Sequence, residues 1–249
     1  MNRRVVITGM GAVTPLGNNV KDTFEGIKEG KCGIRHIDTF DTSDFKVKVA
    51  AYCDINIEDY LDKKEAKRMA RFTQLGMIAT KEAIESSKLL ENDYYSRERI
   101  GVIVGSGIGG IHTYEAEVRK DNIKRVSPFL IPMMIGNILP GRIAIEYGLK
   151  GHCTSVVTAC STGNNAIGDA FDQIRFGKLD AVVAGGSEAT IGPIELSGFA
   201  NMTALTQSDD PLRASIPFDK ERNGFVMGEG AGIIVLEEYE HAVKRGANI

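Results

Sequence analysis

The sequence predicts an α/β fold, a layered domain in which helices cover both faces of a sheet. Short apolar runs recur along the 249 residues, and most are continuous rather than alternating in hydrophobicity. This pattern is typical of strands buried on both sides. Stretches with apolar residues every three or four positions separate the runs, as amphipathic helices require. Because no low-complexity segment, long linker or internal repeat divides the chain, we expect one domain.

Each expected element follows from its own pattern. The strand-like runs are residues 5–8, 100–104, 155–158, 181–184 and 233–236. The longest helical repeat covers about 64–87, and a second helix starts at Asn164, with a seam of small and apolar residues that favours a place in the core. The segment 127–148 is apolar but broken by Pro128, Pro132 and Pro140, so it is not one helix. Core packing and a role as pocket wall or subunit contact are equally open for it.

Composition excludes several classes of protein. With 43% hydrophobic and 25% charged residues, the chain has ample material for a core. The net charge of -3 gives no overall attraction to nucleic acid or to an anionic membrane. No apolar run approaches the ~20 residues of a membrane span, and Gly9, Gly11 and Pro15 interrupt any signal-peptide core. The four cysteines show no CxxC spacing, so we expect reduced thiols, no metal and a cytoplasmic protein.

A glycine-rich loop follows the strand at 100–104. Gly105, Gly107 and Gly110 match GxGxxG, but the acidic residue expected about 20 positions later is missing. We therefore expect no dinucleotide cofactor. Glycines that admit a close neighbouring backbone are the better interpretation.

Cys160 is the strongest candidate for chemistry. It stands in "VVTACSTGNN", on the turn between the strand at 155–158 and the following helix. A helix N-terminus favours thiolate, and small neighbours let a substrate carbonyl approach the sulfur. The Cys160 N–H would help to hold an oxyanion. A buried, inert thiol is the alternative, since free cysteines are most often of that kind.

A base for this thiol is missing from the sequence pattern. The histidines are His36, His112, His152 and His241, and none stands in a recognisable catalytic motif. A cysteine hydrolase with a Cys–His pair is therefore poorly supported.

Basic residues gather locally in this acidic chain. Lys64, Lys67, Arg68 and Arg71 have the spacing of one helical face, and "VRKDNIKRV" adds Arg119, Lys120, Lys124 and Arg125. Such faces are usually just solvated. If this one binds a partner, we expect a small acidic surface or a phosphate.

Several long motifs, in order, resemble the β-ketoacyl-acyl-carrier-protein synthases, and most closely the synthase II type. They include "RRVVITGMGAVTPLG", "GSGIGG", "PGRIAIEYGLKG", "TACSTGNNAIGDAF", "AVVAGGSEA" and "PFDKERNGFVMGEGAGIIVLEEYEHAVKRGA". The resemblance covers the whole chain. It implies a thiolase-like fold with a mixed, mostly parallel sheet, and it implies that residues 1–249 correspond to the N-terminal of two similar halves.

The resemblance also implies roles for single residues. Cys160 matches the nucleophile that accepts the acyl chain as a thioester. Gly107, Ile108 and Phe199 match the apolar gate and walls of the acyl pocket, and Phe129 and Leu130 match positions where a dimer partner reaches the pocket's end. The residues that match the surface for the acyl carrier protein are Lys64, Lys67, Arg68, Lys124 and Arg125. Thr203 stands where some relatives carry a basic residue, which implies one carrier contact fewer.

The implied activity is acyl transfer to Cys160, followed by decarboxylative Claisen condensation with malonyl carrier in fatty acid elongation. No cofactor is implied, and a homodimer is. The family's two catalytic histidines, its lysine and its phenylalanine loop match nothing up to residue 249, so this chain alone is expected not to condense. An alternative is a non-catalytic carrier-docking and dimerisation module like the chain-length factors, but those lack the cysteine that this chain has.

Overall fold

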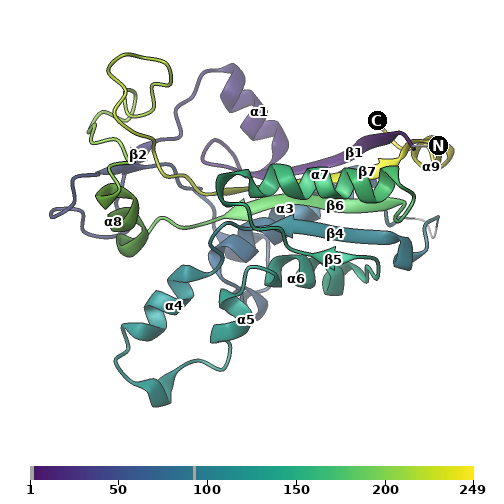
Figure 1. Ribbon diagram of the computed structural model, residues 1–249, viewed down its shortest axis with the longest axis horizontal. Helices are drawn as coiled ribbons and strands as arrows, with labels where there is room; N and C mark the ends of the chain where they lie inside the picture. Colours follow the sequence, from purple (N-terminus) through teal and green to yellow (C-terminus); the bar gives the residue numbers. More distant parts are fainter. Residues whose placement is uncertain (1–2, 92–93) are drawn as a thin grey trace.

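The computed structural model describes residues 3–91 and 94–249. Its centre is a five-stranded sheet in the order β1-β7-β6-β4-β5 (Figure 1). The strands are β1 (Val5–Val13), β4 (Ile100–Gly105), β5 (Cys153–Thr154), β6 (Ala181–Glu188) and β7 (Gly230–Glu238). β4 pairs in parallel with β5 and β6, whereas β7 pairs antiparallel with β6 and β1. The predicted α/β fold and mixed sheet are confirmed, although its antiparallel part is larger than expected.

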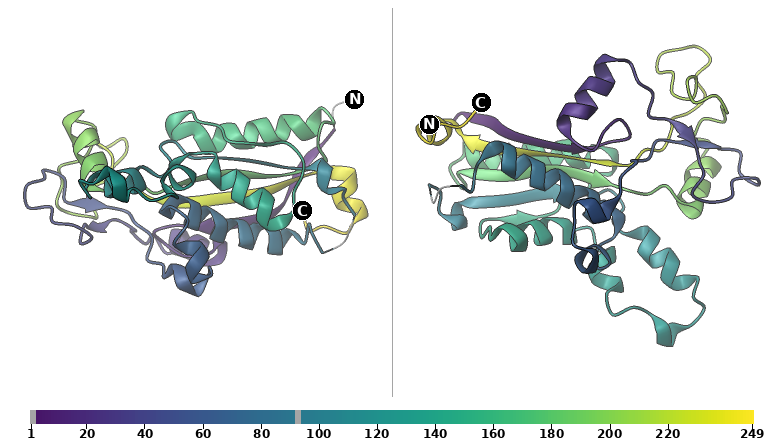
Figure 2. Two further views of the ribbon diagram at one scale, coloured as in Figure 1. Left: turned by 90° about the horizontal axis from the view of Figure 1, so that it is seen from below. Right: turned by 180° about the vertical axis from the view of Figure 1, so that it is seen from behind.

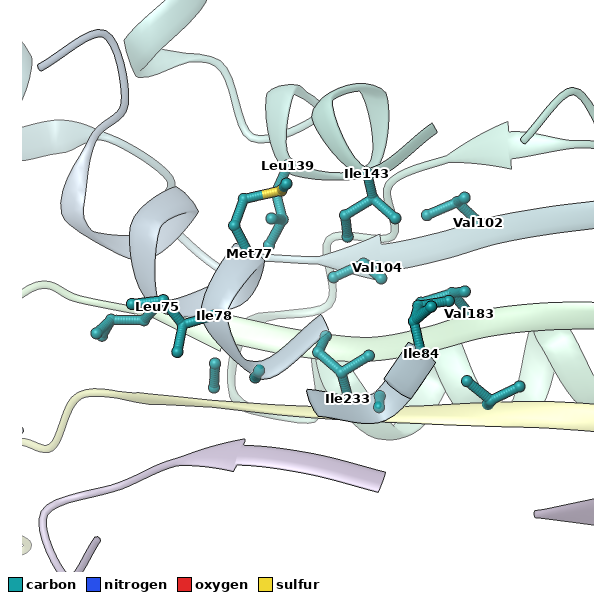
Figure 3. Packing of buried hydrophobic residues seen from close by; sticks show 14 of the residues in the cluster. Leu75, Met77, Ile78, Ile84, Val102, Val104, Leu139, Ile143, Val183 and Ile233 are labelled. Atoms are coloured by element: carbon teal, nitrogen blue, oxygen red, sulfur yellow. The ribbon is translucent and has the colours of Figure 1, made fainter. Parts of the chain in front are cut away.

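Helices cover the two faces of the sheet (Figure 2). α3 (Arg71–Ser87) and α6 (Ile138–Tyr147) pack on one face, and α7 (Thr162–Arg175) packs on the other. The core under α3 and α6 contains Leu75, Leu139 and Ile233, each at most 1% exposed (Figure 3). Burying a side chain of this size stabilises the fold by about 1.5–3 kcal/mol.

The seam of α7 forms the second core, with Ala166, Ala170 and Ile174 fully buried against β4 and β6. Small residues at this seam let the helix lie close to the sheet. Its other face is open, since Phe171 is 36% exposed. The expectation that this helix runs through the core holds for one face only.

β1 carries two glycines that let α3 lie directly on the strand. A Cβ at Gly11 would stand 1.8 Å from the Ala79 carbonyl oxygen, and one at Gly9 would stand 2.3 Å from that of Ala83. Any side chain there would collide with the helix backbone. The same close approach, predicted for the glycine-rich loop after residues 100–104, is confirmed there: a Cβ at Gly105 would stand 2.3 Å from the Val156 carbonyl oxygen, and one at Gly110 would stand 2.3 Å from that of Met133.

Smaller elements surround this centre. They are α1 (Val20–Lys28), β2 (Arg35–His36), β3 (Val49–Ala50), η1 (Ile57–Asp59), α2 (Lys63–Ala66), η2 (Arg97–Arg99), α4 (Ile111–Val118), η3 (Ile123–Arg125), α5 (Leu130–Met134), η4 (Ala159–Ser161), α8 (Pro193–Asn201) and α9 (Tyr239–Lys244). α4, η3 and α5 form an arm that extends from the sheet (Figures 1 and 2). Among the described residues, no helix is both long enough and apolar enough to span a membrane.

Two predicted elements are wrong. The expected helix over 64–87 is two helices, α2 and α3, because the chain leaves helical geometry at Ala70, with ψ 158°. The expected strand at 155–158 is irregular, and the strand in this region is the short β5 just before it. In the segment 155–158, the Thr158 N–H donates to the side chain of Thr162, at 2.9 Å from Oγ1, rather than to a neighbouring strand.

Candidate active site

Cys160 lies on η4, a single turn that leads directly into α7. The residue before it, Ala159, has φ +52°, in the left-handed region that residues other than glycine and asparagine seldom adopt. Strain of this kind is concentrated at functional sites, where the surrounding structure holds it in place. Here it turns the chain sharply before the helix, and Cys160 is exposed.

Side-chain hydrogen bonds before and after Cys160 in the sequence hold this turn. The Ser161 hydroxyl donates to the Thr158 carbonyl at 2.9 Å, and it lies 2.9 Å from Asn165 Oδ1. The Thr158 hydroxyl also donates to Asn165 Oδ1, at 3.1 Å. Three polar side chains therefore hold the turn, and none of them is the thiol itself.

The first turn of α7 is pressed against the ends of β4 and β6. A Cβ at Gly105 would stand 2.3 Å from Thr162 Cγ2 and 2.3 Å from the Val156 carbonyl oxygen. At Gly186 it would stand 3.1 Å from Gly163 Cα. Glycine at the strand ends lets the helix N-terminus approach the sheet, and this contact places Cys160.

A cavity of about 780 Å³ opens beside Cys160. Its volume lies in the range of small-molecule sites. Most of its lining is apolar or backbone, and the lining side chains include Cys160, Ile108, Phe199, Phe225 and Glu188. Phe199 and Phe225 meet edge to face, with ring centroids 5.7 Å apart. An apolar chain fits such a lining better than a charged ligand does.

The loop that carries Ile108 is held by Glu188, the last residue of β6. Glu188 Oε2 accepts the N–H groups of Gly107 at 2.8 Å and Ile108 at 3.2 Å, and Oε1 accepts the Ser106 hydroxyl at 3.0 Å. Burial raises the pKa of the Glu188 carboxyl, although these hydrogen bonds favour its charged form. One carboxylate thus fixes the backbone of the predicted gate.

The structure therefore brings Cys160, Gly107, Ile108 and Phe199 into one cavity. Sequence patterns missed Glu188 and the segment 225–232, which also lines it. The available signal for Glu188 is a lone acid at the end of a mostly apolar strand, in "AVVAGGSE".

Phe129 and Leu130 do not line this cavity. Both lie where the arm turns into α5, and Phe129 is 40% exposed. They are expected to mark the place where a dimer partner reaches the end of the pocket, and that role stays a prediction.

The residues predicted to bind the carrier lie on two segments, 64–68 and the arm. Arg68 lies over the Phe129 ring of the arm, with its guanidinium carbon 5.2 Å from the centroid. All five predicted residues are exposed, namely Lys64, Lys67, Arg68, Lys124 and Arg125. This set of residues is here called the basic patch.

Arg71 does not belong to the predicted basic face. It bonds Glu229 with Nε at 2.8 Å and Nη2 at 2.6 Å, and Nη2 also donates to the Cys53 carbonyl at 3.0 Å. Glu229 is buried, so this arginine neutralises a buried carboxylate. The helix break before Arg71 turns it inward. Burial, with the nearby Glu229 charge, also raises the pKa of the Cys53 thiol to about 12, so Cys53 is the inert kind of cysteine.

No histidine lines the cavity in the part of the chain that the structure describes. His36 lies on β2, and His241 packs edge to face near Tyr95, with ring centroids 5.4 Å apart. His112 contacts Glu195 on α8. The described residues thus form no Cys–His pair for a cysteine hydrolase.

Comparison with known proteins decides the family. Residues 2–242 match the family described as "Beta-ketoacyl synthase, N-terminal domain". The chain belongs to the β-ketoacyl synthase family. This synthase domain is 47% identical over 252 residues to the 3-oxoacyl-[acyl-carrier-protein] synthase 2 of Staphylococcus aureus (strain N315), which covers 100% of this chain and 61% of the relative. The synthase 2 of Synechocystis sp. (strain ATCC 27184 / PCC 6803 / Kazusa) is also 47% identical, over 99% of this chain and 60% of its own.

Solved structures agree with this assignment. A β-ketoacyl synthase from Burkholderia phymatum STM815 superposes with a TM-score of 0.88 at 31% identity, over 100% of this chain and 62% of the other. A type II PKS ketosynthase, in complex with its acyl-carrier protein and bound to the hexaketide, also gives 0.88 at 28% identity, over 100% and 61%. The thiolase-like fold implied by the sequence motifs is confirmed. This synthase domain spans about three fifths of the length of the curated relatives it matches.

Proposed function

We propose that Cys160 accepts an acyl group from an acyl carrier protein as a thioester. The observation that carries the proposal is the exposed thiol on a strained turn at a helix N-terminus, opening into a large apolar cavity. The thiolate attacks the carbonyl carbon of the acyl thioester, and the tetrahedral intermediate collapses to acyl-Cys160 and the free carrier thiol. The acyl chain then lies in the cavity, between Ile108 and Phe199.

The complete reaction we propose is that of a 3-oxoacyl-acyl-carrier-protein synthase in fatty acid elongation. Malonyl carrier loses CO₂, and the resulting carbanion attacks the Cys160 thioester, which frees the thiol and leaves a 3-oxoacyl carrier. Relatives of this name at 47% identity support the assignment. Decarboxylation places negative charge on an enolate oxygen, and hydrogen-bond donors such as imidazoles would stabilise it.

We further propose that residues 1–249 form the N-terminal half of the two-part fold and do not condense by themselves. In the described residues, no imidazole faces Cys160. The open face of α7 also supports a partner half, since Phe171 on that helix is 36% exposed.

The carrier would dock on the basic patch. Its five cationic side chains fit an acidic protein surface, and complementary charge mainly speeds encounter. The solved ketosynthase with its acyl-carrier protein supports this class of partner. A homodimer is supported by apolar side chains on the arm, with Ile123 88% and Ile131 58% exposed. The four unpaired cysteines support a reducing, cytoplasmic setting.

Intact-mass measurement after incubation with an acyl carrier thioester tests the acyl transfer. We expect a gain of one acyl group, absent in Cys160→Ala and retained in Cys53→Ala, whose thiol is buried. No gain in the wild-type chain would contradict transfer by this chain and favour the carrier-docking module. A 3-oxoacyl product made by this chain alone would contradict its predicted inability to condense.

A further inference from the structure

A second polar cluster lies outside the cavity, where α4 meets α8. It consists of His112 and Glu115 on α4 and Glu195 on α8. One ligand atom from each residue lies within 4.8 Å of the other two. The reaction proposed above uses none of these residues.

Glu195 is the unusual member of this cluster. Its side chain is 2% exposed, and neither carboxylate oxygen has a hydrogen-bond partner among the residues that the structure describes. A buried carboxylate without partners carries a large desolvation cost, so in folded proteins such groups are paired or bind cations. His112 Nδ1 lies 3.5 Å from Glu195 Oε1, which is too long for a good hydrogen bond.

The same separations suit two ligands of one ion. His112 Nδ1 lies 3.5 Å from a Glu195 oxygen and 3.8 Å from Glu115 Oε2. Ligands at roughly 2.0–2.2 Å from a common metal are separated by at most about 4.4 Å. Both distances fit a nitrogen and an oxygen on either side of a cation.

The remaining groups orient Glu115 and leave room for the cluster. Arg119 donates to Glu115 Oε1 with Nε at 2.9 Å and Nη2 at 2.6 Å, so Oε2 is the oxygen that points toward His112. A Cβ at Gly192 would stand 2.3 Å from His112 Cε1 and 2.6 Å from Glu195 Oε2. Only a glycine at the start of α8 lets imidazole and carboxylate sit together there.

We propose that His112, Glu115 and Glu195 bind one divalent transition-metal ion such as Zn²⁺. One imidazole and two carboxylates are a donor set that such ions accept, and Glu195 is the carboxylate that lacks a cation of its own in the described part of the chain. The ion would link α4, which follows the Ile108 loop, to α8, which carries Phe199. None of the three ligand residues lines the cavity beside Cys160, so the ion would take no part in the thioester chemistry.

Metal titration of the chelator-treated full chain tests the site, with Co²⁺ as a spectroscopic probe and Zn²⁺ as its competitor. We expect one ion per chain and a Co²⁺ spectrum without thiolate charge-transfer bands. Glu195→Gln and His112→Ala should each weaken binding by roughly tenfold or more. His36→Ala, which removes an exposed imidazole elsewhere, should leave binding unchanged. Zn²⁺ should raise the melting temperature of the wild type but not of the two ligand variants.

Three results would overturn the proposal. The first is the absence of stoichiometric binding by the wild type, which would leave the cluster as a His–carboxylate ion pair. The second is unchanged affinity in both ligand variants, and the third is binding that shows thiolate bands and disappears in Cys160→Ala. Since the His112 side chain is 34% exposed, His112→Ala should fold even if Glu195→Gln does not.

Discussion

The two ends of β6 hold carboxylates in opposite ways. At its start, Asp180 is bonded by the guanidinium groups of Arg99 at 2.8 Å and Arg3 at 2.7 Å. At its end, Glu188 is bonded by two backbone N–H groups and a hydroxyl, with no cation. The first arrangement holds chain segments together by charge, while the second shapes a loop beside Cys160. Structural and functional carboxylates in this sheet thus differ in their partners more than in their burial.

The same contrast extends to the elements around each end. Near Asp180, the buried Glu237 on β7 is bonded by Arg245, Tyr95 and Thr8, so both of its carboxylate oxygens accept hydrogen bonds. Near Cys160 the elements meet through glycines and a strained alanine. One end stabilises the fold, and the other places the exposed Cys160 side chain at some cost in stability.

The largest expected effect is at the charged end. Arg245→Met leaves Glu237, which is fully buried, without its cation, and we expect a loss of about 3–5 kcal/mol in the free energy of unfolding. Urea denaturation measures it. Arg213→Met is the matched control, since Arg213 is 49% exposed and such pairs contribute about 0–1 kcal/mol. A loss equal to that of the control would mean that Glu237 is held by Tyr95 and Thr8 alone.

A smaller effect is expected at the Cys160 end. Gly105→Ala places a methyl group 2.3 Å from Thr162 Cγ2 and from the Val156 carbonyl, which pushes α7 off the sheet. Overpacking of this kind costs about 1–3 kcal/mol, and acylation of Cys160 should fall with it. Thermal unfolding measures the loss of stability. Intact mass after incubation with an acyl carrier thioester measures the loss of acylation.

Gly168→Ala provides the comparison within α7. Nothing lies within 4 Å of a Cβ at that position, so alanine should stabilise this chain by about 0.5–1 kcal/mol. If both variants behaved alike, close packing at the strand ends would not be what places the thiol.

Sequence patterns predicted what depends on neighbouring residues. The turn at Cys160, the apolar strands and the α7 seam all follow from local composition. The run at 155–158 was predicted as a strand for its β-branched residues, but Val156 packs over Gly105 and Thr158 bonds within its own turn. The Thr162 hydroxyl, a local side-chain partner, takes the place of the backbone hydrogen bonds of strand pairing.

What sequence patterns missed depends on contacts between distant segments. Glu188 bonds a loop 81 residues away in sequence, and Arg71 bonds Glu229 158 residues away. Helical periodicity placed Arg71 on the basic face. Nothing in the neighbouring sequence marks the helix break at Ala70, or the buried Glu229 to which Arg71 bonds. The family motifs supplied Ile108 and Phe199, whereas the role of Glu188 becomes visible only when β4 and β6 are paired in register.

The smallest effect gives the sharpest test of the contrast, because the two carboxylates should respond to pH with opposite signs. Hydrogen bonds from Arg99 and Arg3 outweigh burial and lower the pKa of Asp180, so its contribution to stability is present above about pH 4 and is lost as pH falls through the folded-state pKa. Burial raises the pKa of Glu188, so its contribution is present below about pH 4 and is lost as pH rises through the folded-state pKa. Relative to the wild type, Glu188→Gln should therefore gain stability as pH rises from 4 to 7, whatever its constant offset.

Asp180→Asn should instead gain relative to the wild type as pH falls from 4 to 3. Urea denaturation of both variants across this range measures the two slopes, and the offset from altered packing cancels because only the change with pH is compared. Slopes of the same sign would mean that both sites shift the carboxyl pKa in the same direction, so that the guanidinium groups at Asp180 and the backbone N–H groups at Glu188 favour the same charge state. In that case the absence of a cation at Glu188 would not distinguish the Cys160 end of the sheet from the other.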